Sequence, residues 1–115
     1  MEKIKVESEI EVTVKMIGGK SKPLVLYFLN ERGTSRFNEI LKHLKHISPK
    51  TLTNQLRELE SDGLIDRVAY AEVPPRVEYT ATKKGESLMP ILELMCEWGE
   101  KNAGDRYEIT NPQCE

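Results

Sequence analysis

The chain lacks any apolar run long enough to cross a membrane, and its N-terminus, MEKIKVESEIEV, lacks the apolar core of a signal peptide. These absences predict a cytoplasmic protein without membrane contact. Only two cysteines occur, Cys96 and Cys114, too few for a disulfide framework, so in a reducing compartment we expect two free thiols. Internal repeats and low-complexity segments are also absent, and 115 residues suit one domain with one core.

Motifs of common enzyme classes are missing as well. There is no glycine-rich phosphate loop, no nucleophile elbow and no acid pair placed by a motif, so we expect no catalytic activity. Ser35 and Ser48 are better explained as helix caps than as nucleophiles. His43 and His46 could join a cysteine around a metal, but no tight spacing links them, and a place on a basic surface is the preferred interpretation. We expect no metal and no other cofactor.

The most informative stretch that is present begins at Ser48. Ser48 can act as an N-cap, with Pro49 at the first helical position, and Gly63 suits the left-handed residue that follows a helix. Between them, leucines spaced i, i+4 and i+7 predict one stripe against a core. These are Leu52, Leu56 and Leu59.

The other faces of this helix carry side chains that suit DNA. Asn can pair with adenine edges, Lys and Arg with guanine or phosphate, and Thr with several partners. Acidic residues gather at the far end, which favours the N-terminal half of the helix in a groove; an ordinary amphipathic surface helix is the alternative. The candidates for base or groove contacts are Lys50, Thr51, Thr53 and Asn54, and those for phosphate contacts are Arg36, Ser48, Arg57 and Arg76.

The neighbouring segments complete a pattern. FNEILKHL, residues 37–44, has helical apolar spacing and is joined to Ser48 by a short turn without glycine. Two helices so connected can place the second in a major groove. Ile65–Val73 and Arg76–Thr82 then predict two strands, because β-branched and aromatic residues flank a Pro-Pro bend. Arg76 could reach a phosphate or be a solvated turn charge.

Charge is distributed unevenly along the chain. The whole chain has a net charge of −2, but residues 18–57 hold eight basic and two acidic residues, a net charge of +6. Residues 58–115 hold six basic and thirteen acidic residues, a net charge of −7. A positive block over the proposed helix-turn-helix is what phosphate binding requires.

The two ends of the chain carry apolar stripes. Residues 83–102 predict a helix, kinked near Pro90, whose stripe exceeds what a small core covers. A dimer interface is the natural use, and folding back on its own domain is the alternative. That stripe contains Leu88, Ile91, Leu92, Met95 and Trp98. Near the N-terminus, apolar residues alternate from Ile4 to Met16, which by period predicts a strand, although Ile10, Val14 and Ile17 also fit a helix.

Three runs of the sequence resemble the HxlR family of bacterial and archaeal winged helix-turn-helix regulators. They are IGGKSKPLVLYFL, SRFNEILKHLKHISPKTLTNQLRELESDGLIDR and YAEVPPRVEYTATKKGESL, and the similarity spans about Glu9 to Trp98. The resemblance implies a homodimer whose first and last helices pack across the two-fold axis, which adds Ile10 and Val14 to the expected interface. It also implies that residues 10–17 are helical, and we adopt helix over strand.

Two positions depart from that family. Several members sense oxidants through a cysteine shortly before the GGK motif, where this chain has Ser8 or a close neighbour, and no cysteine precedes Cys96. A hydroxyl cannot form a thiolate, so N-terminal thiol sensing is not expected. Ser21 stands where the family usually has tryptophan, a change without a functional account.

The expected fold is mainly α with a small antiparallel β-hairpin (α+β): a winged helix-turn-helix with N- and C-terminal dimerisation helices. We expect one domain over residues 1–104 and a flexible tail over 105–115. Within the domain, a reading head spans about 22–82 and dimerisation helices span about 8–17 and 83–102. The expected function is regulation of transcription as a homodimer on a palindromic site in double-stranded DNA. The alternative is a protein-interaction module without DNA binding, and a small-molecule effector stays open.

Overall fold

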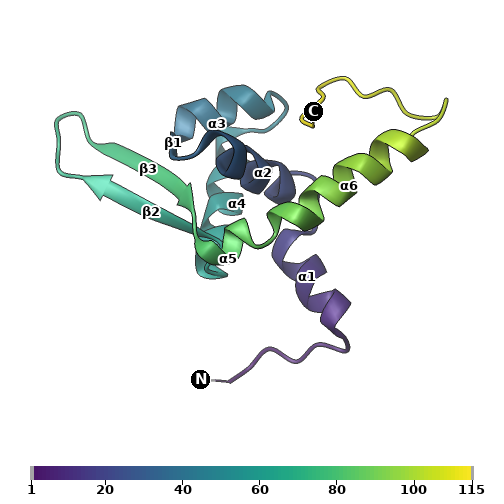
Figure 1. Ribbon diagram of the computed structural model, residues 1–115. Helices are drawn as coiled ribbons and strands as arrows, with labels where there is room; N and C mark the ends of the chain where they lie inside the picture. Colours follow the sequence, from purple (N-terminus) through teal and green to yellow (C-terminus); the bar gives the residue numbers. More distant parts are fainter. Residues whose placement is uncertain (1, 115) are drawn as a thin grey trace.

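A small antiparallel sheet lies at one side of a group of helices, and its two longest strands project from them as a hairpin (Figure 1). The structure is a computed structural model that describes residues 2–114. Over these residues the elements are, in chain order, α1 (Glu9–Ile17), α2 (Lys22–Arg32), β1 (Ser35–Arg36), α3 (Phe37–Leu44), α4 (Pro49–Ser61), β2 (Ile65–Tyr70), β3 (Arg76–Ala81), α5 (Lys83–Glu86) and α6 (Met89–Asn102). The predicted mainly α fold with a small antiparallel β-hairpin is confirmed, and β1, which was not predicted, extends the hairpin to a three-stranded sheet.

The core forms around α2. Residues 25–29 of this helix are all buried, which agrees with a sequence that is apolar nearly all round. Helix α4 contributes its leucine stripe, whose three members are at most 2% exposed. Helices α3, α5 and α6 and strand β3 also contact α2, so this helix is the centre of the hydrophobic core.

The sheet has the strand order β1-β3-β2, with both pairs antiparallel. Strands β2 and β3 form the predicted wing, but β2 ends at Tyr70 and not at Val73. Its turn, residues 71–75, is exposed and contains Pro74 and Pro75, which cannot donate to a ladder. Ile65 and Tyr79 are buried, so the face that carries them lies against the protein body.

The N-terminal segment is helical where the resemblance placed a helix, and the period-two strand hypothesis is wrong there. Ser8 caps α1 by accepting a hydrogen bond from the Glu11 amide at 3.3 Å. Alternation misled because most of its apolar residues remain exposed, and only Ile17 at the end of α1 is buried. Ser8 therefore has a structural role as the N-cap of α1.

The predicted helix over residues 83–102 is interrupted at Ser87 and Leu88. Pro90 lies in the first turn of α6, where a missing amide proton costs nothing, so the predicted kink is wrong: the proline helps to start a second helix. Before the break, Gly85 packs so closely on Leu64 that a Cβ on the glycine would lie 2.1 Å from the Leu64 carbonyl oxygen.

The expectation of free thiols is also wrong. Cys96 in α6 and Cys114 form a disulfide with Cα atoms 6.0 Å apart, although 18 positions separate them in the sequence. Local patterns cannot show this pairing, because the chain must first turn back after α6. The part of the predicted tail that the structure describes, residues 105–114, returns towards α3 (Figure 1); Glu115 lies outside the described residues.

Candidate nucleic-acid interface

The start of α4 is held by side-chain caps. The Ser48 hydroxyl oxygen accepts from the Thr51 amide at 3.1 Å, and the same hydroxyl donates to Thr51 Oγ1 at 2.9 Å. Thr53 donates its hydroxyl proton to the Pro49 carbonyl at 2.8 Å. Ser48 and Thr53 thus donate their hydroxyl protons to acceptors within the protein. Each hydroxyl oxygen can still accept a hydrogen bond from a donor outside the protein.

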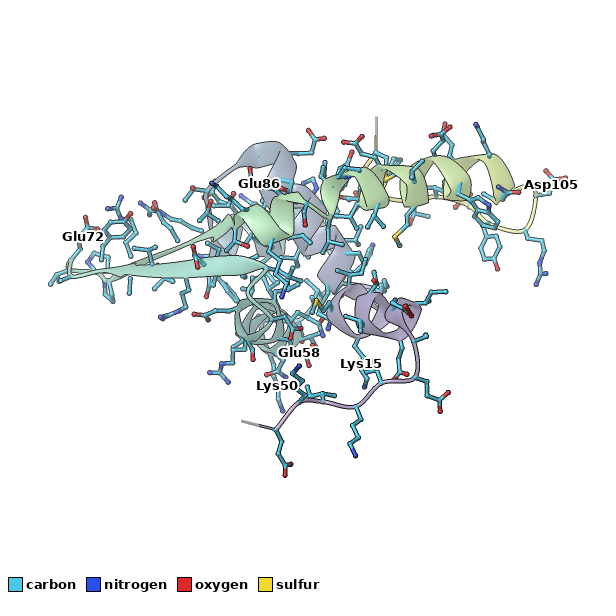
Figure 2. All side chains as sticks on the ribbon, turned by 60° about the horizontal axis from the view of Figure 1, so that its bottom comes forward. Lys15, Lys50, Glu58, Glu72, Glu86 and Asp105 are labelled. Atoms are coloured by element: carbon cyan, nitrogen blue, oxygen red, sulfur yellow. A yellow bond between two sulfur atoms is a disulfide. The ribbon has the colours of Figure 1, made fainter. Side chains whose placement is uncertain are left out.

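An exposed polar stripe lies opposite the buried leucines of α4. Lys50, Asn54 and Arg57 follow one another at i, i+4 and i+7 and are all exposed, so they share a face of the helix. Figure 2 shows Lys50 projecting from the body on the side of α4. The stripe offers a point cation, an amide with both donor and acceptor, and a planar guanidinium, the combination that base edges and phosphates recognise.

The far end of α4 has a different electrostatic character. Glu58 lies 3.4 Å from Nζ of Lys22, a buried lysine that also donates to the Lys15 carbonyl at 2.9 Å. Lys22 thereby ties α1, α2 and α4 together and is withdrawn from the positive surface. Since acidic Glu60 and Asp62 follow, positive charge on α4 is confined to its first two and a half turns, as the sequence indicated.

A cavity between α4 and the wing contains a basic residue that the sequence interpretation missed. This cavity of about 320 Å³ is lined by Thr53, Leu56, Arg57, Glu60, Arg67 and Tyr79. Arg67 in β2 pairs with Tyr79 and follows buried Ile65 by two positions. Strand alternation therefore directs Arg67 to the α4 side, a signal available in the sequence.

Arg76, the wing residue chosen from the sequence, is engaged within the wing. Its guanidinium lies 3.9 Å from the centroid of the Tyr70 ring. Its Nε is 3.2 Å from Glu72 Oε2 without hydrogen-bond alignment, and its Nη1 is 3.7 Å from Glu78 Oε2. Alternation places Arg76 and Glu78 on the face opposite Arg67. The structure thus separates Arg76 from the α4 surface and balances its charge.

Arg36 is likewise apart from α4. It lies in β1, at the edge of the sheet opposite to β2, and β2 is the strand that packs on α4. It is exposed, and its backbone amide donates to Glu39 Oε1 at 2.8 Å. The structure therefore brings together Ser48, Lys50, Thr51, Thr53, Asn54 and Arg57, and leaves Arg36 and Arg76 elsewhere.

The two outer helices expose apolar side chains. On α1, Ile10 is 76% exposed and Val14 is 57% exposed. On α6, Ile91, Met95 and Trp98 are exposed, as is Leu94, a residue outside the predicted set. Leu92 differs: it is 3% exposed and belongs to the core of its own chain, and Leu88 packs partly against that core.

Residues 2–114 contain neither a group of metal-binding side chains nor a membrane-spanning helix. No cluster of three or more His, Cys, Asp or Glu side chains in this part of the chain could hold a metal ion. None of the helices found over the same residues has the length and apolar character needed to traverse a lipid bilayer.

Two helices joined by a short turn, followed by a hairpin beside the second helix, define the winged helix-turn-helix class. A family model described as "HxlR-like helix-turn-helix" matches residues 16–107. The chain belongs to the HxlR family of winged helix-turn-helix transcriptional regulators.

Individual relatives agree with this assignment. An HTH-type transcriptional regulator of Methanothermobacter thermautotrophicus is 50% identical over 103 residues, covering 84% of this chain and 78% of the relative. The regulator YkvN of Bacillus subtilis is 47% identical over 108 residues, covering 90% and 91%. Among solved structures, the redox regulator HypR in its oxidized form superposes with a TM-score of 0.78 at 42% identity, covering 89% of this chain and all of that one.

Proposed function

We propose that this regulator binds a palindromic DNA site as a homodimer in the cytoplasm, with α4 in the major groove and the wing beside it. The observation that carries the proposal is the exposed stripe of Lys50, Asn54 and Arg57 opposite the buried leucines of α4. A helix anchored on one face and presenting such groups on the other can dock without changing the core.

Within this arrangement each side chain has a chemical role. Asn54 is the candidate for a bidentate contact with adenine, and Lys50 for guanine or phosphate, with Thr51 and Thr53 accepting or contacting a thymine methyl. Arg57 and Arg67, which line one cavity, are the candidates for the backbone contact between helix and wing. We assign this contact to Arg67 and not to Arg76, because two glutamates balance the charge of Arg76.

The apolar surfaces of α1 and α6 support the proposed homodimer. Ile10, Val14, Ile91, Met95 and Trp98 are exposed at helical spacing on two helices that project from the reading head (Figure 1). Exposed apolar stripes of this kind mark interaction surfaces, and a two-fold dimer matches a palindromic site. We therefore expect each chain of the dimer to bind one half of the palindromic DNA site.

Salt titration of DNA binding tests the placement of the phosphate contacts. Arg67→Ala should weaken binding and make the slope of log affinity against log salt shallower by about 0.9, the value for one lost phosphate contact. Arg76→Ala is the matched control, since it removes the same charge from the other face of the wing and should leave the slope unchanged. Equal slopes for wild type and Arg67→Ala would contradict the placement.

The protein-interaction alternative is favoured by the net charge of −7 over residues 58–115. It predicts flow-through on immobilised heparin and on random duplex DNA at low salt, whereas a DNA-binding regulator is retained. Gel shifts on DNA upstream of its own gene and neighbouring genes would then locate the operator.

A further inference from the structure

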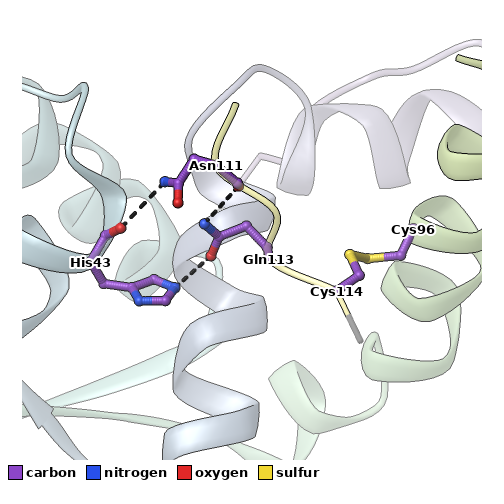
Figure 3. The surroundings of a disulfide bond; sticks show 5 residues. All are labelled: His43, Cys96, Asn111, Gln113 and Cys114. Atoms are coloured by element: carbon purple, nitrogen blue, oxygen red, sulfur yellow. Dashed lines mark hydrogen bonds between the residues drawn. A yellow bond between two sulfur atoms is a disulfide. The ribbon is translucent and has the colours of Figure 1, made fainter. Parts of the chain in front are cut away.

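The disulfide lies where the last helix meets the returning chain. Cys96 is on α6 and Cys114 is near the end of the C-terminal segment (residues 105–114), and both are half-buried (Figure 3). A single sulfur–sulfur bond therefore joins the C-terminal segment to α6 and closes a loop between them.

The C-terminal segment also contacts the helix-turn-helix. Gln113 Oε1 accepts a hydrogen bond from Nε2 of His43 in α3 at 2.5 Å, and the Asn111 side-chain amide donates to the His43 carbonyl at 3.5 Å (Figure 3). The His43 ring lies 4.4 Å from the ring of Phe28 in α2. The disulfide and these polar contacts thus connect α6 to the first helix of the helix-turn-helix.

The surroundings of the disulfide leave it open to reagents. On one side, a cavity of about 600 Å³ between α6 and the C-terminal segment is lined by Cys96, Cys114 and apolar side chains that include Met95, Trp98 and Tyr107. On another side, a cavity of about 390 Å³ is lined by both cysteines, Tyr27, Glu31, Glu93, Glu97 and Glu100. A half-buried disulfide flanked by cavities admits an attacking thiolate, unlike one sealed in a core.

We propose that Cys96 and Cys114 form a reversible thiol–disulfide site that reacts with low-molecular-weight disulfides and, when oxidised, clamps the C-terminal segment between α6 and α3. A DNA-binding regulator works in a reducing compartment, where disulfides are usually transient and responsive. The effect on DNA binding rests on the proposed function, whereas the exchange and the clamp rest on the disulfide and its surroundings.

The chemistry needs no further oxidant. One cysteine thiolate attacks a small disulfide, forming a mixed disulfide and releasing one small thiolate. The second cysteine thiolate attacks the protein sulfur of that mixed disulfide, closing Cys96–Cys114 and releasing the other small thiolate. Two protein thiols are oxidised, one small disulfide is reduced to two thiols, and the protons lost by the cysteines are taken up by the released thiolates.

The acidic cavity sets a preference among small disulfides. Lys101 pairs with Glu97 at 2.9 Å, which offsets one of the four carboxylates beside the sulfurs. The remaining negative charge attracts a cationic reagent and repels an anionic one, and salt weakens both effects. The site should therefore favour cationic over neutral and neutral over anionic disulfides.

The preference is tested with reduced full-length protein and three reagents: cystamine, bis(2-hydroxyethyl) disulfide and glutathione disulfide. Free thiols are alkylated at timed intervals and counted by mass spectrometry. Cystamine should close the disulfide faster than glutathione disulfide by at least about threefold, a ratio that shrinks at high salt. The double variant Glu93→Gln, Glu100→Gln should compress that ratio. Failure of all three reagents, or rates independent of charge, would overturn the site.

The clamp is tested by tryptic cleavage after Arg106. Cleavage should be at least about tenfold slower in the oxidised protein than in the reduced protein, because a held segment must open before it is cut. Cleavage after Lys3 and Lys5 in the N-terminal segment is the internal control and should not change. Cys96→Ser and Cys114→Ser should each behave as the reduced protein in oxidant, and equal rates in both redox states would overturn the clamp.

Gel shifts connect the clamp to DNA. Fixing α6 to α3 preorganises the proposed dimer helix relative to the helix-turn-helix, so oxidised protein should bind its site at least about threefold more tightly than reduced protein. Cys96→Ser should bind equally in both conditions. Equal binding of wild type in both states would overturn the regulatory step, whereas absence of DNA binding in both states would refute the proposed function and leave the exchange chemistry standing.

Discussion

Two regions of the molecule treat their apolar residues in opposite ways. In the reading head, the three leucines of the α4 stripe are each at most 2% exposed, and α4 packs against α2 and the sheet. In α6, Leu92 is 3% exposed, while Leu94 is 64% exposed and Trp98 is 69% exposed. Helix α1 resembles α6, since Ile10 is 76% exposed.

The difference shows which apolar side chains find partners within one chain. Helices α2, α3 and α4 and the sheet form a core to which Ile17 of α1 and Leu92 of α6 are added, and the polar face of α4 stays exposed and available for a ligand. The outer helices bury one side and leave apolar side chains exposed. Exposure of this apolar surface to water is unfavourable in free energy unless another surface covers it. We expect a second copy of the chain to supply that surface.

A large loss of stability is expected at the junction between the two regions. Gly85→Ala would place a Cβ 2.1 Å from the Leu64 carbonyl oxygen and 3.2 Å from Leu26, so backbone must shift. We expect the free energy of unfolding to fall by about 2–4 kcal/mol in urea titration. Gly99→Ala in α6 is the control: nothing lies within 4 Å of the added Cβ, and helix propensity predicts a gain of about 0.5–1 kcal/mol. Similar stability of Gly85→Ala and wild type would contradict the close packing.

A leucine from each region makes the comparison direct. Leu56→Ala removes a fully buried side chain and should lower the free energy of unfolding by about 2–5 kcal/mol at every protein concentration. Leu94→Ala should lower it by less than about 1 kcal/mol in dilute protein, and should instead weaken self-association in sedimentation. Unchanged self-association in Leu94→Ala would remove this residue from the dimer surface.

The smallest effect concerns the turn of the helix-turn-helix. Lys45 has a φ of +65°, in the left-handed region that favours glycine, and the turn contains no glycine. Lys45→Gly should raise the free energy of unfolding by up to about 1 kcal/mol, measured by thermal or urea denaturation. Lys42→Gly removes the same charge from the interior of α3 and should lower it by about 1 kcal/mol. If both substitutions destabilise equally, the turn is not strained.

The elements predicted correctly were those encoded by adjacent residues. For α4, the Ser48 cap, Pro49, the leucine stripe and Gly63 all act within a few residues, and its observed bounds agree with them. Alternation failed to predict α1, because most apolar side chains of this short helix are exposed and their order does not reflect burial in the core. The break before α6 also escaped prediction; just before it, Gly85 of α5 packs closely on Leu64, a residue far away in the sequence.

The candidate site divides in the same way. Lys50, Asn54 and Arg57 could be placed on one face from helical spacing alone. The separation of Arg67 from Arg76 required the register of β2 on β3, because a shift of one residue would exchange the two faces of the wing. The partners of Arg76 and the cavity shared by Arg57 and Arg67 likewise exist only once the strands are paired.

The sequence by itself determined the winged helix-turn-helix class, the extent of α4 and the concentration of positive charge on its first turns, because caps, periodicity and local charge act between near neighbours. Only the tertiary structure decided that Arg76 lies on the face of the wing away from α4, which residue of α6 enters the core, and that Cys96 meets Cys114. Those contacts join residues far apart in the chain, and a linear pattern does not contain the path by which the backbone brings them together.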